Sequence, residues 1–294
     1  MNSLRSLTEN IDMIIATTIE EVRKQVKEWK RQGLTVGLVP TMGYLHEGHA
    51  SLVRESVKSC DRTAASVFVN PTQFGPGEDL EDYPRDFGHD CSLLESEGCD
   101  LVFHPDVNEM YPEGFSTYVE IQSEMPKQLC GKTRPIHFRG VCTVVSKLFN
   151  IVTPDMAFFG QKDAQQLAVI RRMVQDLSIG VEIVGCPIIR EEDGLARSSR
   201  NTYLNAQERQ AALVLSRAVF LGQNMADAGE KDAEKIVSAM KELIGAETLA
   251  RIDYVSAVDS VTMMPVSEIK EPVLFAMAVY IGKTRLIDNF TAEG

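Results

Sequence analysis

The sequence predicts an α/β fold in which a mostly parallel sheet is followed by a smaller α+β domain. Up to about residue 186, apolar runs of strand length alternate with helical patterns, as in successive βαβ units. Beyond that point, two long helical patterns precede apolar or alternating runs, as in helices packed on a small antiparallel sheet. The length of 294 residues also suits two domains at about 150 residues each. We therefore predict domains at residues 1–186 and 187–294.

Local patterns predict each element of the first part. Val22, Val26 and Trp29 recur at helical spacing, and this helix should end before Gly33. Residues 34–39 form an apolar, β-branched run that suits a strand, and Pro40 is expected to end it. Further strands are predicted at residues 64–69, 101–103, 156–159 and 181–184, and further helices around residues 141–148 and 167–177.

The second part has its own start and stop signals. Asn205 with Glu208 three residues later is a capping pair that opens a helix through about Leu221. A second helix is predicted at about residues 232–244. Strands are predicted at residues 251–258, 273–280 and 284–288.

The composition is that of an acidic globular protein. Thirty basic against 42 acidic residues give a net charge of −12, which argues against nucleic acid as a partner because such binding needs clustered cations. The six cysteines include no CxxC pair, so neither a zinc ribbon nor a thioredoxin-type site is indicated, and no metal-ligating residues are predicted. No segment approaches the ~20 apolar residues of a membrane helix, and the N-terminus lacks a secretory h-region. We predict a cytoplasmic protein without a membrane partner.

The sharpest motif follows the first strong strand and reads Pro40-Thr41-Met42-Gly43-Tyr44-Leu45-His46-Glu47-Gly48-His49. A helix beginning near Leu45 to Glu47 would place His46 and His49 on one side of its first turn, beside backbone N–H groups that attract anions. Two imidazoles there could donate hydrogen bonds to a polyphosphate. The alternative is that both histidines cap or pack. A zincin HExxH site is excluded, because Ala50 stands where its second histidine would be.

A second loop, Phe159-Gly160-Gln161-Lys162-Asp163, again follows a predicted strand and leads into a helix. Ligands of open α/β sheets bind outside the carboxyl ends of the strands, so this loop and the histidine loop should face the same crevice. Lys162 could contact a phosphate, and Asp163 could cap the helix or hold a ribose hydroxyl. An exposed Lys-Asp pair of no function is the alternative.

A third loop lies at the predicted domain junction. Ser198 and Ser199 stand between Arg197 and Arg200, a compact set of donors suited to phosphate oxygens, and Gly194 would allow the loop to close. A solvated linker would have a similar composition. No GxGxxG follows a strand and no GxxxxGK[ST] is present, so nicotinamide-type and P-loop phosphate cradles are not indicated.

Two further segments could contact a small substrate. Asn70 and Gln73 follow the strand at residues 64–69 and are neutral side chains that both donate and accept, although Asn70-Pro71 is also typical of a turn. Five cations, Arg139 among them, lie between Met125 and Pro154 without a carboxylate. We interpret this segment as a positive wall or mobile flap of the site, with a solvated basic face as the alternative.

Five motifs in register carry a resemblance to a known family. They are Pro40-Thr41-Met42-Gly43 with His46-Glu47-Gly48-His49, Phe68-Val69-Asn70-Pro71-Thr72-Gln73-Phe74, His137-Phe138-Arg139-Gly140-Val141, Phe159-Gly160 with Lys162-Asp163 and Gln165-Gln166, and Ser198-Ser199-Arg200-Asn201. Over about residues 36–204 the sequence resembles the pantothenate synthetase (pantoate–β-alanine ligase) family. Residues 1–12 look like an N-terminal extension without a counterpart.

The resemblance implies a Rossmann-like domain of the class I aminoacyl-tRNA-synthetase-like, HIGH-type nucleotidylyltransferase superfamily. It also implies a two-step reaction. Pantoate attacks the α-phosphorus of MgATP to give pantoyl adenylate and pyrophosphate, and the amine of β-alanine then displaces AMP to form pantothenate. ATP is the expected co-substrate and Mg²⁺ the expected metal, held largely by ATP phosphates and water. A homodimer through the N-terminal domain is expected as well.

The same resemblance implies roles for individual residues. His46 and His49 would bind phosphates, with His49 as the proton donor, while Gln73 and Gln166 would hold pantoate and Gln73 would also lie near β-alanine. Asn70 and Arg139 are further predicted pantoate contacts. The predicted catalytic set is His49, His46, Lys162, Ser198, Ser199 and Arg200. The predicted ATP contacts are Met42, Gly43, Tyr44, Leu45, His46, Glu47, Gly48, His49, Gly160, Gln161, Lys162, Asp163, Ile189, Arg197, Ser198, Ser199 and Arg200.

Two other functions are compatible with these residues. A related nucleotidyltransferase would adenylate its substrate, release pyrophosphate and stop there, without forming an amide. A non-catalytic nucleotide-binding or RNA-binding relative would use the same loops as a sensor, although the chain lacks a basic RNA-binding surface.

Overall fold

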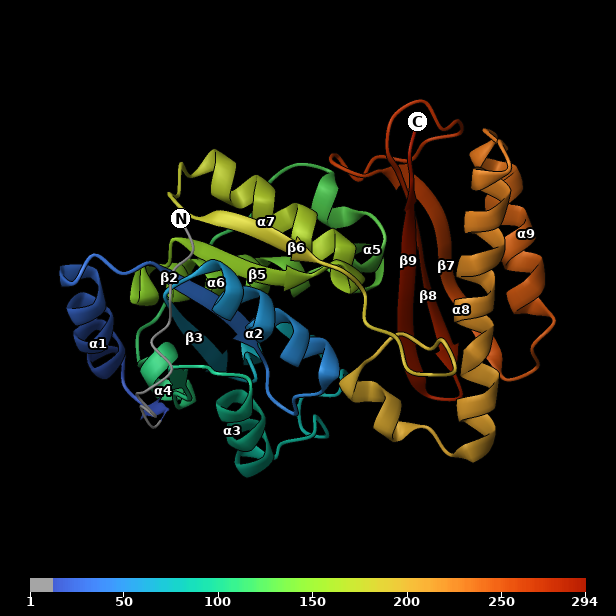
Figure 1. Cartoon of the computed structure of the whole chain (residues 1–294). Coiled ribbons are helices and arrows are strands. Elements are labelled where there is room, and N and C mark those ends of the chain that lie inside the picture. Colours follow the sequence, from blue (N-terminus) through green and yellow to red (C-terminus); the bar gives the residue numbers. More distant parts are fainter. Residues whose placement is uncertain (1–12) are drawn as a thin grey trace. The chain divides into compact units, whose positions relative to one another are not determined.

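The computed structural model describes residues 13–294, so the predicted extension at residues 1–12 lies outside the described residues (Figure 1). The chain forms two compact units. The first takes the described residues up to Ile121, with Ile136–Gln161 and Ile170–Pro187. The second takes Gln122–Pro135, Lys162–Val169 and Ile188–Gly294. The domain boundary at residue 187 stays a prediction, since two segments that precede it belong to the second unit.

The first unit contains a six-stranded sheet in the order β1-β4-β3-β2-β5-β6, and its strand pairs are parallel. The strands are β1 (Ile14–Ala16), β2 (Val36–Thr41), β3 (Arg62–Val67), β4 (Leu101–Phe103), β5 (Met156–Gly160) and β6 (Glu182–Cys186). From β2 the chain order runs to β3 and β4 on one side and to β5 and β6 on the other. The carboxyl ends of β2 and β5 therefore flank the point where strand order reverses, which is where ligands of such sheets bind.

Helices cover both faces of this sheet. They are α1 (Ile19–Arg31), α2 (Glu47–Ser59), α3 (Phe87–Ser96), the short α4 (Val107–Met110) and α6 (His137–Val152). Val53 of α2 and Leu94 of α3 pack with Val39, Val102 and Phe158 of the strands in one buried cluster. Helix α1 contacts α6, and right-handed crossovers place these two on the opposite face. As predicted, α1 buries Val22, Val26 and Trp29.

The expectation that Pro40 ends the first strong strand is wrong. Strand β2 continues through Pro40 to Thr41, and Pro40 pairs with Ser66 of β3. The pairing of β2 with β5 covers Gly37 and Leu38, which lie before this position. At Pro40 the β2–β5 pairing has already ended, so the N–H that proline lacks is not needed for hydrogen bonds between these two strands.

The second unit contains an antiparallel sheet in the order β7-β8-β9, with β7 (Ala250–Asp259), β8 (Val273–Ile281) and β9 (Thr284–Ala292). Helices α8 (Ala206–Asp227) and α9 (Ala233–Gly245) pack on it side by side (Figure 1). The predicted capping pair is present, because Asn205 and Glu208 bond reciprocally at the start of α8. Leu215 and Ile236 of the helices share a core with Phe275 and Met277 of β8.

Five short elements and helix α7 complete the described part of the chain. They are η1 (Pro71–Gln73), η2 (Met125–Lys127), α5 (Cys130–Thr133), η3 (Gln161–Asp163), η4 (Ser199–Tyr203) and α7 (Ala164–Asp176), whose residues divide between the units. The parallel sheet with helices and the small α+β unit confirm the predicted fold class. All six cysteines are free thiols. Among the helices of residues 13–294, none combines the length and the apolar character needed to cross a bilayer.

The close packing of α2 on β2 yields a testable prediction. A Cβ atom at Gly37 would lie 2.2 Å from Ser56 Oγ and 3.1 Å from Phe158 Cε2, and Ser56 is fully buried against Thr63. Gly37→Ala should therefore lower the free energy of unfolding by about 1–3 kcal/mol, the usual effect of overpacking. The measurement is urea denaturation. Gly180→Ala, where an added Cβ meets nothing within 4 Å, should stay close to the parent protein. Equal stability of both variants would contradict this account of α2.

Candidate active site

The histidine loop starts with two residues in the left-handed region. Gly43 has φ +86°, and a Cβ there would lie 3.0 Å from Asp90 Oδ2, so this position favours glycine. Tyr44 follows with φ 51°, a conformation that is strained for a residue with a side chain. The loop therefore needs outside support to keep its shape.

Asp90 of α3 supplies that support. Its carboxylate accepts hydrogen bonds from the backbone N–H groups of Tyr44 at 2.9 Å and Leu45 at 2.6 Å, and the residue is 1% exposed. Burial raises the pKa of the Asp90 carboxyl, while these two hydrogen bonds favour the charged form and act against the rise. The sequence did not single out Asp90, because it lies in a stretch rich in acidic residues that resembles a solvated surface.

His46 and His49 meet at the start of α2, as the motif predicts. Their ring centroids are 4.1 Å apart. His46 is the N-cap residue, and its Nδ1 accepts from Gly48 N at 3.1 Å, while His49 Nδ1 accepts from His46 N at 3.2 Å. Because a neutral imidazole carries its proton on the nitrogen that does not accept, both rings hold the proton on Nε2. The capping role is therefore present, and it leaves Nε2 of each ring for the predicted donation to a phosphate.

Asn70 and Gln73 form a connected pair beside this loop. Asn70 is 1% exposed, and its Nδ2 donates to Gln73 Oε1 at 3.0 Å and Gly140 O at 3.2 Å. Its Oδ1 accepts from the hydroxyl of Tyr111 at 2.7 Å and from Thr72 Oγ1 at 2.9 Å. Asn70 therefore orients Gln73, and its own contact with pantoate stays a prediction. Tyr111, which the sequence analysis missed, acts through this network.

The first turn of α6 packs directly on the Asn70–Gln73 turn. His137 Nδ1 lies 3.1 Å from Gln73 O, and a Cβ at Gly140 would lie 2.4 Å from Thr72 O. Only glycine allows this approach. Gln73 Nε2 lies 3.1 Å from Met42 Sδ, which links the turn to the histidine loop. The half-buried Arg139 stacks over Tyr118, with Cζ 4.8 Å from the ring centroid.

The remaining predicted contacts of the first unit lie at the ends of elements. Glu47, the first residue of α2, pairs with Arg54. Gly160 ends β5 and pairs with Cys186, and a Cβ there would meet nothing within 4 Å. The exposed Gln161 follows it.

In the second unit, Lys162 and Asp163 belong to η3, and Gln166 lies half-buried in the first turn of α7. The neighbouring Gln165 is 5% exposed and structural. Its Oε1 accepts from Cys130 N at 3.0 Å, and its Nε2 donates to Gln128 O at 2.7 Å and Met125 O at 3.1 Å. Gln165 is thus occupied by the fold, and the pantoate contact of Gln166 stays a prediction.

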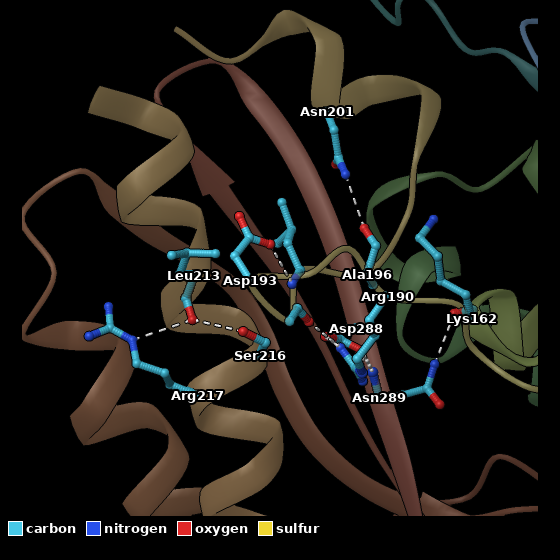
Figure 2. Close-up of polar contacts among 12 residues, drawn as sticks. Lys162, Arg190, Asp193, Ala196, Asn201, Leu213, Ser216, Arg217, Asp288 and Asn289 are labelled. Atoms are coloured by element: carbon cyan, nitrogen blue, oxygen red, sulfur yellow. Dashed lines mark hydrogen bonds and ion pairs between the residues drawn. The ribbon is translucent and has the colours of Figure 1, made fainter. Parts of the chain in front are cut away.

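The loop that begins at Ile189 is a short hairpin. Arg197 N donates to Ile189 O at 2.9 Å, and Arg190 and Ala196 form an antiparallel bridge. Arg190 makes a bidentate ion pair with the buried Asp288 of β9, at 2.7 and 3.0 Å (Figure 2). Among the described residues, Arg197 Nε and Asn201 Oδ1 are the buried side-chain atoms without a hydrogen-bond partner. An unsatisfied guanidinium donor is what a site for an anion would contain.

The Ser-Ser-Arg motif opens η4. Ser198 Oγ accepts from Arg200 N at 3.3 Å and caps the helix, so this hydroxyl is partly used by the fold. Ser199 is 7% exposed, and its carbonyl accepts from Thr202 Oγ1 at 2.8 Å. Within residues 13–294 no group of three or more His, Cys, Asp or Glu side chains is placed to hold a metal ion.

Comparison with known proteins gives the family. The sequence profile of pantoate-beta-alanine ligase matches residues 14–291. A pantothenate synthetase of Ruminiclostridium cellulolyticum is 59% identical over 274 residues, which cover 93% of this chain and 97% of that protein. The pantothenate synthetase of Enterococcus faecalis is 57% identical over 281 residues, covering 96% and 99%.

Solved structures agree. Pantothenate synthetase from Thermus thermophilus aligns with a TM-score of 0.90 at 45% identity, covering 95% of this chain and 99% of that one. Pantoate-beta-alanine ligase from Francisella tularensis, complexed with beta-gamma ATP and beta-alanine, aligns with a TM-score of 0.78 at 33% identity, covering 95% and 97%. Together with the paired histidines and the parallel sheet that carries them, these matches show that the chain belongs to the pantoate-beta-alanine ligase family.

Proposed function

We propose that this protein condenses (R)-pantoate with β-alanine at the expense of ATP, giving pantothenate, AMP and pyrophosphate through pantoyl adenylate. Family membership over nearly the whole chain supports an ATP-dependent ligase that forms pantothenate. The Francisella tularensis relative, complexed with beta-gamma ATP and beta-alanine, supports two of the substrates. The single structural observation that carries the proposal is that Nδ1 of both His46 and His49 accepts from a backbone N–H at a helix N-terminus, which leaves Nε2 of each ring as the donor.

The chemistry needs no protein nucleophile. In the first step a pantoate carboxylate oxygen bonds to the α-phosphorus of ATP while the bond to the pyrophosphate oxygen breaks. In the second step the neutral amine of β-alanine bonds to the acyl carbon, the bond to the AMP oxygen breaks, and one proton is released. Both steps depend on reactants held in line and on donors placed where negative charge grows. An imidazole N–H placed beside the phosphates supplies such stabilisation by donating a hydrogen bond.

We propose roles for the site residues as follows. His46, His49 and Lys162 bind the phosphates of ATP, with His49 as proton donor, and the Arg197–Arg200 segment contacts the same nucleotide with its guanidinium and hydroxyl donors. Asp163 contacts the ribose. Gln73, Gln166, Asn70 and Arg139 hold pantoate, and Gln73 also lies near β-alanine. The hydrogen-bonding capacity of the Gln73 side chain supports this role. Its amide offers two N–H groups and two lone pairs, and the contacts with Asn70 and Met42 use only part of them.

Mg²⁺ is proposed as part of the MgATP substrate. Mg²⁺ typically keeps several waters and binds through substrate phosphates, so it needs few side-chain ligands. It would neutralise charge on the phosphates, while the chain supplies N–H donors around them.

We further propose that the protein acts in the cytoplasm as a homodimer. The six free cysteines fit a reducing compartment. The homodimer rests on the resemblance to the family.

The dependence on both acid substrates tests the proposed function. AMP release from MgATP should require pantoate and β-alanine together, and pyrophosphate release should require pantoate alone. The two products are measured by coupled assays in parallel reactions that each omit one substrate. Repeated pyrophosphate release with β-alanine present but neither consumed nor converted to an amide would indicate the related nucleotidyltransferase instead. AMP release that ignores both acids would contradict the proposal.

Removal of one donor tests the proposed roles of His49 and Lys162. His49→Ala and Lys162→Ala should each slow pantoyl adenylate formation by about 10²–10³-fold, as for the loss of one transition-state donor. The rate is measured as pyrophosphate release in a single turnover. Lys58→Ala, at an exposed lysine paired with Glu55, serves as the control and should be near normal.

His49→Asn separates the catalytic from the local structural role. The asparagine amide oxygen would lie near the position of His49 Nδ1 and can still accept from His46 N. No donor would lie at the position of His49 Nε2. We therefore expect the slow rate of His49→Ala with an unchanged melting temperature. A wild-type rate in His49→Asn would rule out donation by Nε2.

A further inference from the structure

Two adjacent residues of β9 hold two segments of the second unit that carry predicted ATP contacts. Asn289 Nδ2 donates to the backbone carbonyl of Lys162 at 2.9 Å (Figure 2). Asp288 holds Arg190, next to Ile189 and at the base of the hairpin that leads to Arg197. Successive residues of a strand point to opposite faces, so one strand can hold a segment on each side.

The position of Asn289 is constrained by the strand and by its hydrogen bonds. The residue is 6% exposed and lies in the regular β8–β9 ladder, opposite Ala276. Its backbone N–H donates to Asp288 Oδ1 at 2.8 Å, and that carboxylate is held by both Nη atoms of Arg190. Arg190 Nη1 also donates to Gly194 O at 3.1 Å. The amide of Asn289 therefore reaches Lys162 from a rigid strand rather than from a loop.

Lys162 lies at the start of a helix. It is the middle residue of the three-residue element η3, which runs directly into α7. Gln165 anchors the segment on its C-terminal side through Cys130 and Gln128. The bond from Asn289 reaches the carbonyl of Lys162 directly, and the orientation of that peptide decides where the Lys162 side chain leaves the backbone.

We propose that Asn289 is a positioning residue for the ligase reaction: it holds the backbone of Lys162 so that the ammonium group is presented to the phosphates of ATP. This inference rests on the proposed function, and it assigns to Asn289 no contact with a substrate. The effect of Asn289 passes through Lys162. Loss of the Asn289 amide should thus impair adenylate formation and leave the use of β-alanine unchanged.

The test is a double-mutant cycle on adenylate formation. Asn289→Asp keeps the size of the side chain but replaces the donating NH₂ by an oxygen that faces the Lys162 carbonyl. We expect kcat/KM for ATP to fall roughly 10- to 100-fold, as for a small misplacement of a reacting group. The KM for β-alanine, measured with preformed pantoyl adenylate, should not change. In the Lys162→Ala background the same substitution should have less than about a twofold effect, because contacting residues that act through one another are not additive.

Matched controls separate this role from general damage to the unit. Asn224→Asp makes the same chemical change at an exposed position of α8 and should leave the rate unchanged. The same double-mutant cycle is measured with Asn289→Ala, so that the inference can still be tested if Asn289→Asp fails to fold. Equal losses in the wild-type and Lys162→Ala backgrounds, or full activity of both Asn289 variants, would overturn the inference. Failure of the parent protein to form pantothenate would instead overturn the proposed function.

Discussion

The protonation of the two histidines depends on the backbone at the start of α2. Because Gly48 N and His46 N each donate to an Nδ1 atom, the geometry of one helical turn decides which ring nitrogens can donate. That turn follows a strained peptide at Tyr44, which the buried Asp90 holds from α3. The chemistry of the site is therefore supported by residues that touch no substrate.

The second unit uses the same principle with a different element. There the support comes from strand β9, whose neighbours Asp288 and Asn289 reach Arg190 and Lys162. Two segments that lie far apart in the sequence are thus held by residues of the regular β8–β9 ladder. The short element η3 is hydrogen-bonded to a sheet of which it is not part. Such an anchor suits Lys162, whose ammonium group has to lie at one place to bind the phosphates.

The sequence predicted well what depends on local patterns. The stripe of Val22, Val26 and Trp29 and the capping pair at Asn205 and Glu208 are both present, since helix periodicity and caps involve residues a few positions apart. The prediction for Pro40 was wrong, because the effect of a proline depends on which neighbouring strand needs its N–H. Asp90 and Asn289 were missed for a related reason. Their partners lie 46 and 127 positions away along the chain.

The division of the chain between the units has a consequence for dissecting the protein. Because Gln122–Pro135 and Lys162–Val169 belong to the second unit, a fragment starting at Ile188 would contain all of β7, β8 and β9 but neither Lys162 nor the Gln165 anchor. Asn289 would then face solvent where it now meets a peptide. A cut near residue 187 would leave every segment of the first unit on one piece but would divide the second unit between the two pieces, so the C-terminal piece would not be an autonomous module.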